Sequence, residues 1–121
     1  MALTALGSGA LGGTLLPGFE LVADELDLYD HLEGADLVIT GEGCLDDTSS
    51  AGKVVGGIAS VAVEFAIPVL AIVGSDVRSD RSVPAGIDVV SLVDAFGDEA
   101  AFAEPKRVIE NAAAAWLAAR R

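Results

Sequence analysis

The chain has 121 residues, 52% of them hydrophobic and only 5% aromatic, which is enough for one core and about one domain. Its formal net charge is −12, and no Lys or Arg precedes position 53, so we do not expect nucleic acid as a partner, since phosphate backbones are bound by basic clusters. No apolar run approaches the roughly 20 residues of a membrane helix, and the N-terminus lacks the basic region of a signal peptide. One cysteine excludes an internal disulfide and indicates a reducing, cytoplasmic setting.

The first clear structural signal is a helical pattern over residues 19–32. Apolar side chains recur there at helical spacing, most charged residues fall between them, and Gly34 follows as a C-terminal cap. The pattern predicts one amphipathic helix with Tyr29 on its buried stripe. His31, the only histidine, falls on the opposite side, and we interpret it as solvated rather than catalytic.

Three short apolar runs predict buried strands, at residues 37–40, 69–73 and 87–92. One helical period begins near Val54, and another begins at Pro105, which suits the first turn of a helix. Buried strands that alternate with helices form parallel sheets with right-handed crossovers. We therefore predict an α/β fold: a three-layer, Rossmann- or flavodoxin-like parallel sheet with helices on both faces.

The segment from Gly41 to Lys53 carries most of the reactive side chains that follow a predicted strand. It combines glycines, three carboxylates and one lysine: Gly41, Glu42, Gly43, Asp46, Asp47, Gly52 and Lys53. In open α/β sheets, ligands bind at the carboxyl ends of the strands. Carboxylates hold divalent cations, lysine neutralises phosphate, and glycines let backbone N–H groups approach a ligand. We therefore expect a loop that handles an anionic substrate together with a divalent cation.

The charged residues of this loop have structural alternatives. The positive charge of Lys53 near the start of a helix interacts unfavourably with the helix dipole, by about 0.3–1 kcal/mol, and this placement indicates a function. The alternative is that the helix begins earlier, with Thr48 or Ser49 as its N-cap. We interpret Asp46 as a metal ligand or as a base toward a substrate hydroxyl. For Asp47 we favour a cap of the next helix.

Two other side chains of the segment, Glu42 and Cys44, are interpreted differently. Glu42 lies between two glycines and has little turn-forming purpose there, so we interpret it as functional. Cys44 has no histidine near it in the sequence, and we interpret it as a half-buried filler rather than a nucleophile.

The same segment resembles the signature near the C-terminus of bacterial glycerate kinases of the type-1 family. The matching residues follow Asp36 and are Thr40-Gly41-Glu42-Gly43, Leu45-Asp46 and Gly52-Lys53. Weaker matches at 17–22, 67–74 and 86–88 extend the resemblance over nearly the whole chain. It implies that residues 1–121 form a single, partial α/β domain, the C-terminal part of a longer two-domain kinase.

The resemblance implies phosphoryl transfer from ATP to D-glycerate with Mg²⁺. It implies catalytic roles for Asp46 and Lys53, contacts to substrate or phosphate from Gly41, Glu42, Gly43 and Gly52, and metal ligation by Glu42 and Asp46. The chain departs from the family pattern at Cys44, where the family has Arg, and at residues 48–50, where it has Gln-Thr-Leu. Losing the guanidinium removes a bidentate contact to phosphate or carboxylate.

Three functions stay open at this point. The chain is part of a glycerate kinase and inactive alone, or a stand-alone module that binds an anion or metal without chemistry, or a structural half that pairs with another chain. The expected partners are D-glycerate, ATP, and either an N-terminal part of the enzyme or a second copy of the chain.

Overall fold

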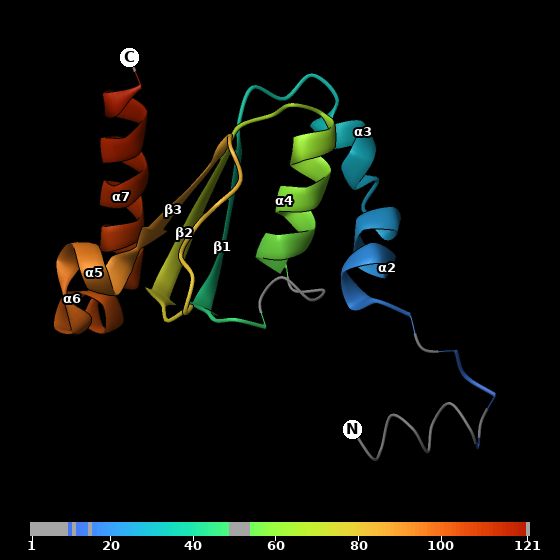
Figure 1. Cartoon of the computed structure of the whole chain (residues 1–121), viewed down its shortest axis with the longest axis horizontal. Helices are drawn as coiled ribbons and strands as arrows, with labels where there is room; N and C mark the ends of the chain where they lie inside the picture. The colour runs from blue at the N-terminus through green and yellow to red at the C-terminus, as the bar shows by residue number, and fades with distance from the viewer. Residues whose placement is uncertain (1–9, 11, 15, 49–53, 121) are drawn as a thin grey trace.

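The structure is a computed structural model, and it describes residues 10, 12–14, 16–48 and 54–120. Figure 1 shows its helices and strands. In order, the main elements are α2 (Gly18–Glu25), α3 (Leu28–Leu32), β1 (Val38–Leu45), α4 (Val54–Glu64), β2 (Val69–Asp76), β3 (Ile87–Ser91), α5 (Leu92–Phe96), α6 (Asp98–Ala103) and α7 (Pro105–Ala119).

The three strands form one parallel sheet in the order β1-β2-β3. Val69 of β2 lies opposite Val38 of β1 on one side and opposite Ile87 of β3 on the other. The three predicted strands and their parallel arrangement are therefore confirmed.

Helices pack on both faces of the central strand β2, which is apolar on both sides. Its odd-numbered residues from Val69 to Val73 belong to clusters that include side chains of α4. Leu70 and Ile72 point the other way, into a cluster with α5, α6 and α7. In Figure 1, α4 and α7 accordingly lie on opposite sides of the strands, which confirms the three-layer α/β prediction.

The predicted loop begins later than expected, because β1 continues through Leu45. Gly41, Glu42 and Cys44 pair with residues of β2, which itself extends to Asp76. A long neighbouring strand thus keeps the glycine-rich segment extended. At the other edge, β3 ends at Ser91 instead of residue 92, where the Ser91 hydroxyl accepts a hydrogen bond from the N–H of Asp94 and so caps α5.

The predicted helix over residues 19–32 is two helices. Asp27 adopts a left-handed conformation with φ of 50° and separates α2 from α3. Tyr29 is exposed and its ring lies 6.5 Å from that of Phe65, which corrects its assignment to the core; Val22 and Leu26, ahead of the break, are exposed as well. His31 is exposed as predicted. Gly34 has φ of 83°, as a C-terminal cap requires.

The C-terminal helix α7 begins at Pro105, as predicted, and packs Val108 and Ala112 into the core. Near its end, the guanidinium of Arg120 stacks on the ring of Trp116 at 4.4 Å. The Trp116 indole N–H donates to Asp88 of β3, which secures α7 against the edge strand. None of the described helices combines the length and apolar character that a membrane crossing requires.

Gly41 and Gly43, two residues apart in β1, differ in the space around them. A Cβ atom on Gly41 would lie 2.3 Å from the carbonyl oxygen of Ile72, whereas one on Gly43 would meet nothing within 4 Å. We expect Gly41→Ala to lower the free energy of unfolding by about 1–3 kcal/mol, because the two strands must move apart. Gly43→Ala should change it by less than about 0.5 kcal/mol. Urea unfolding of both variants tests this, and equal losses would contradict the close approach of β1 and β2.

Candidate functional site

The candidate site lies where β1 and β2 end. Since the strands are parallel, their carboxyl ends lie at the same edge of the sheet, and the polar segments that follow each of them become neighbours. Asp46 and Asp47 follow β1, and Arg78 and Ser79 follow β2.

The Asp46 carboxylate is oriented by the next turn of the chain. Its Oδ1 accepts hydrogen bonds from the Thr48 N–H at 2.9 Å and from the Thr48 hydroxyl at 2.6 Å. The hydroxyl of Thr48, which was considered above as an N-cap, thus donates to Asp46. Ser49, the other N-cap candidate, lies outside the described residues. Asp46 is therefore held by local hydrogen bonds at the carboxyl edge of the sheet.

Asp47 connects the two loops. It accepts from the Ser79 N–H at 2.8 Å and from the Ser79 hydroxyl at 2.7 Å, across 32 residues of sequence. These bonds, first the hydroxyl and then the N–H, lower the pKa of Asp47 below its ordinary value. The predicted cap role for Asp47 concerns residues just before α4 that lie outside the described part of the chain; within the described part, its carboxylate binds Ser79 and fixes the second loop.

A buried ion pair anchors the second loop at its base. Asp76, only 5% exposed, accepts from the Arg78 Nε at 2.9 Å and from its Nη2 at 2.8 Å. The hydrogen bond from Arg78 is the main reason that the pKa of Asp76 is lowered. Arg81 adds a bond to the Asp76 carbonyl oxygen and an ion pair of 2.7 Å with Asp94. The loop is thus attached to β1, to β2 and to α5.

Glu42 stands apart from these contacts. Its Oε1 is buried and has no hydrogen-bond partner among the described residues. A buried carboxylate oxygen without a donor is costly, so this atom is suited to contact a cation or a donor that arrives with a ligand. This supports the prediction that Glu42 is functional.

The oxygen donors fit Mg²⁺ in type but are spread along the chain. Because β1 is extended, the Cα atoms of Glu42 and Asp46 are roughly 13 Å apart at the usual rise of a strand. Accordingly, no group of three or more His, Cys, Asp or Glu residues that could hold a metal gathers in the described part of the chain. Mg²⁺ commonly uses only one or two carboxylates and takes its other ligands from water and substrate phosphates, so Glu42 and Asp46 remain predicted as separate anchors.

The remaining predicted residues have three outcomes. Gly41 and Gly43 lie within β1 rather than in a loop. Cys44 is exposed, so its assignment as a half-buried filler is wrong: it lies near the end of an edge strand. Gly52 and Lys53 fall outside the described residues.

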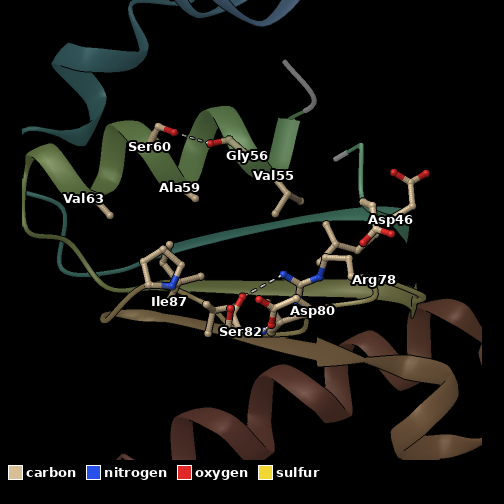
Figure 2. A pocket seen from close by; sticks show the side chains of 15 residues that line it. Asp46, Val55, Gly56, Ala59, Ser60, Val63, Arg78, Asp80, Ser82 and Ile87 are labelled. Atoms are coloured by element: carbon tan, nitrogen blue, oxygen red, sulfur yellow. Dashed lines mark hydrogen bonds between the residues drawn. The ribbon is translucent and has the colours of Figure 1, made fainter. Parts of the chain in front are cut away.

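Asp46 and Asp47 open onto a pocket between α4 and the loop at 77–86, with a volume of about 580 Å³. Figure 2 shows α4 above the pocket, and Asp46 and Arg78 at one end of it. Volumes of this size are usual for small-molecule sites. The lining residues are Leu45, Asp46, Asp47, Val55, Gly56, Ala59, Ser60, Val63, Arg78, Asp80, Ser82, Val83, Pro84, Ile87 and Val89.

The sequence alone did not assign Asp76, Arg78 or Ser79 to the site. The available signal was their position directly after a buried strand, the same signal that drew attention to Asp46. The bonds from Ser79 to Asp47 could not be predicted, because they join segments that only the sheet brings together, whereas Arg78 and Asp76 are two residues apart in the sequence.

Parallel strands, polar loops at their carboxyl ends and a pocket beside them define an α/β protein with a pocket of small-molecule size at the edge of its sheet. The sequence model of the Glycerate kinase family matches residues 3–120, and the chain belongs to this family.

Curated relatives agree with the family match. The chain is 42% identical over 106 residues to a protein named glycerate kinase from Haemophilus influenzae, in a match that covers 76% of this chain and 28% of the relative. It is 35% identical over 114 residues to glycerate kinase from Bacillus subtilis, covering 80% and 30%. It is 46% identical over 65 residues to glycerate 2-kinase from Escherichia coli, covering 54% and 17%. The chain therefore spans less than a third of the length of these relatives.

The Asp76–Arg78 pair should make stability depend on pH in one direction. Asp76→Asn leaves a largely buried guanidinium without its partner, and we expect a loss of about 2–4 kcal/mol at pH 7. Because the folded-state pKa of Asp76 lies below its ordinary value of 3.8, the contribution is complete above that value and is lost as the pH falls through the folded pKa. The difference between wild type and variant, measured by urea unfolding, should therefore shrink below about pH 4.

The matched control is Asp36→Asn, which alters an exposed carboxylate just before β1. It should change the unfolding free energy by less than about 0.5 kcal/mol. A loss that stays constant down to the lowest pH measured would contradict an ionic role for Asp76.

Proposed function

We propose that this chain supplies one wall of the active site of a glycerate kinase, which transfers the γ-phosphoryl group of ATP to D-glycerate with Mg²⁺. The observation that carries the proposal is the position of Asp46. In a member of the glycerate kinase family, this carboxylate is held at the carboxyl edge of the sheet and lines a pocket of small-molecule size.

In the proposed reaction, a glycerate hydroxyl attacks the γ-phosphorus, a new O–P bond forms, and the bond to the β–γ bridging oxygen breaks to release ADP. Asp46 accepts the proton of the attacking hydroxyl, as an aspartate commonly does in phosphoryl transfer. Lys53 neutralises charge on the transferred group, and the glycine backbone at Gly41, Gly43 and Gly52 approaches the phosphates. When bound, Mg²⁺ supplies further charge neutralisation through carboxylates such as Glu42 or Asp46.

The incomplete cover of the sheet supports a role as one part of a larger enzyme. On the side of α5–α7, a groove of about 570 Å³ lies open between β1 and α6–α7, and Phe102 beside it is 81% exposed. Ile39 of β1 lines the same groove and is also exposed. Parallel sheets are normally covered on both faces. We propose that an N-terminal part of the enzyme, or in its absence a second copy of the chain, covers this groove.

A non-catalytic module that binds an anion or metal is the alternative, and the buried, unpartnered Oε1 of Glu42 favours it over a purely structural role. Mg²⁺ or ATP binding without any turnover, even when the rest of the enzyme is supplied, would distinguish this alternative from the kinase.

The 121-residue chain by itself should have no glycerate kinase activity. Positioning of both substrates provides most of the catalysis in phosphoryl transfer, and a single wall cannot position them. A coupled assay for ADP release with ATP, D-glycerate and Mg²⁺ should give no rate above background. Turnover that depends on glycerate would contradict the one-wall proposal.

The working residues can be tested in Haemophilus influenzae glycerate kinase with its matching segment replaced by this chain. Lys53→Ala should reduce kcat/KM at least about tenfold, equivalent to roughly 1.4 kcal/mol of transition-state stabilisation. Asp46→Asn should lower kcat without changing thermal stability, because its role is in the transition state. Lys106→Ala, which removes an exposed lysine of α7, is the control and should leave the kinetics unchanged. Near-normal kinetics of both site variants would place the site elsewhere.

A further inference from the structure

The pocket beside Asp46 exists because one crossover of the fold lacks a helix. The connection from β1 to β2 includes α4, but residues 77–86, between β2 and β3, contain no helix. The face of β3 that points toward α4 is therefore left with a slot, walled by α4 on one side and by this loop on the other.

The two ends of the slot differ in chemistry. Val63 near the end of α4 is 52% exposed, although it lines the slot, and Val83, Pro84 and Ile87 line it as well. Figure 2 shows this apolar end on the left, with Val63 and Ile87, and the polar end on the right, with Arg78 and Asp46. Between Val55 and Val63 the slot follows α4 for about 12 Å, at the rise of a helix.

We propose that this slot binds the nucleoside of the phosphoryl donor, with the base at the Val63 end and the phosphates toward Asp46. The inference rests on the proposed kinase function, because a nucleoside triphosphate is the donor there. It adds the place of each part of the donor, which the family match does not specify.

The distribution of charge sets this orientation. The Val63 end offers branched aliphatic walls and no cation among the described lining residues, so it accepts a flat, neutral, largely apolar body and disfavours phosphate. The Arg78 side chain extends from the other end toward Ser82 and Asp80, and among the described residues its Nη1 makes a single long bond of 3.4 Å, to the Ser82 carbonyl oxygen. That nitrogen is the donor best placed to turn toward a phosphate.

Asp80 lies between the two ends in Figure 2. Its Oδ1 accepts the Ser82 N–H at 2.8 Å, and an ionised carboxylate has about four acceptor positions. Asp80 can therefore accept hydroxyl groups of a ribose whose base occupies the apolar end.

The experiment is a titration of the ¹⁵N-labelled 121-residue chain with adenosine, followed by NMR. Saturable shifts are expected at the amides of Val63, Val83 and Val89, which line the slot. Val63→Phe fills the apolar end and should weaken adenosine binding at least tenfold. The control is Val22→Phe on α2, where the original side chain is 55% exposed and outside the slot, and it should bind within twofold of wild type.

A second pair of ligands tests the ribose contact even if Val63→Phe alters the fold. Wild type should prefer adenosine to 2′,3′-dideoxyadenosine at least fivefold, and Asp80→Asn should abolish most of this preference. No saturable shift at the slot up to millimolar adenosine, or equal effects of Val63→Phe and Val22→Phe, would overturn the inference and leave the slot to a protein segment.

Failure of the inference and failure of the kinase proposal give different results. In the Haemophilus influenzae enzyme that carries this segment, an unchanged KM for ATP in Val63→Phe, with activity retained, would refute the nucleoside slot and leave the kinase proposal intact. Adenosine binding at the slot together with no glycerate-dependent turnover would refute the kinase proposal and leave the nucleoside slot intact.

Discussion

The burial of β2 between two layers of helices is the constraint on which the rest of the structure depends. Every side chain from Val69 to Val73 is buried, with alternate residues in the cores on opposite faces. Only a strand flanked by parallel neighbours and covered on both faces satisfies so continuous an apolar run. Once β2 is central, the ends of β1 and β2 are neighbours, and the polar segments that follow them must meet.

The helix-free crossover after β2 has two consequences for the site. It opens the slot beside α4, and it requires the loop at 77–86 to be held by side chains instead of by helical packing. The hydrogen bonds from Ser79 to Asp47 and from Arg78 to Asp76 do this at the carboxyl edge of the sheet. The same contacts therefore support the loop and shape the pocket, so variants in them should affect stability and binding together.

The acidic character of the chain bears on the proposed phosphoryl transfer. A net charge of −12 repels anionic substrates at long range. Local cations and backbone donors must therefore compensate, and the described cation nearest to Asp46 and Asp47 is Arg78, which lines the same pocket. In the proposed site, Arg78 is therefore a second candidate cation in addition to Lys53.

The sequence by itself determined the three strands, their parallel arrangement, the α/β class and the start of α7, because apolar periodicity and proline chemistry are local signals of burial and of helix initiation. It also predicted Asp46 and Glu42 as site residues, because ligands in open α/β sheets bind at the carboxyl ends of the strands. Tertiary structure decided the rest. β1 extends through Leu45 because β2 pairs with it that far, and Asp47 binds Ser79 across 32 residues. Such contacts leave no periodic trace in the sequence, because they depend on which strand ends the folded sheet places side by side.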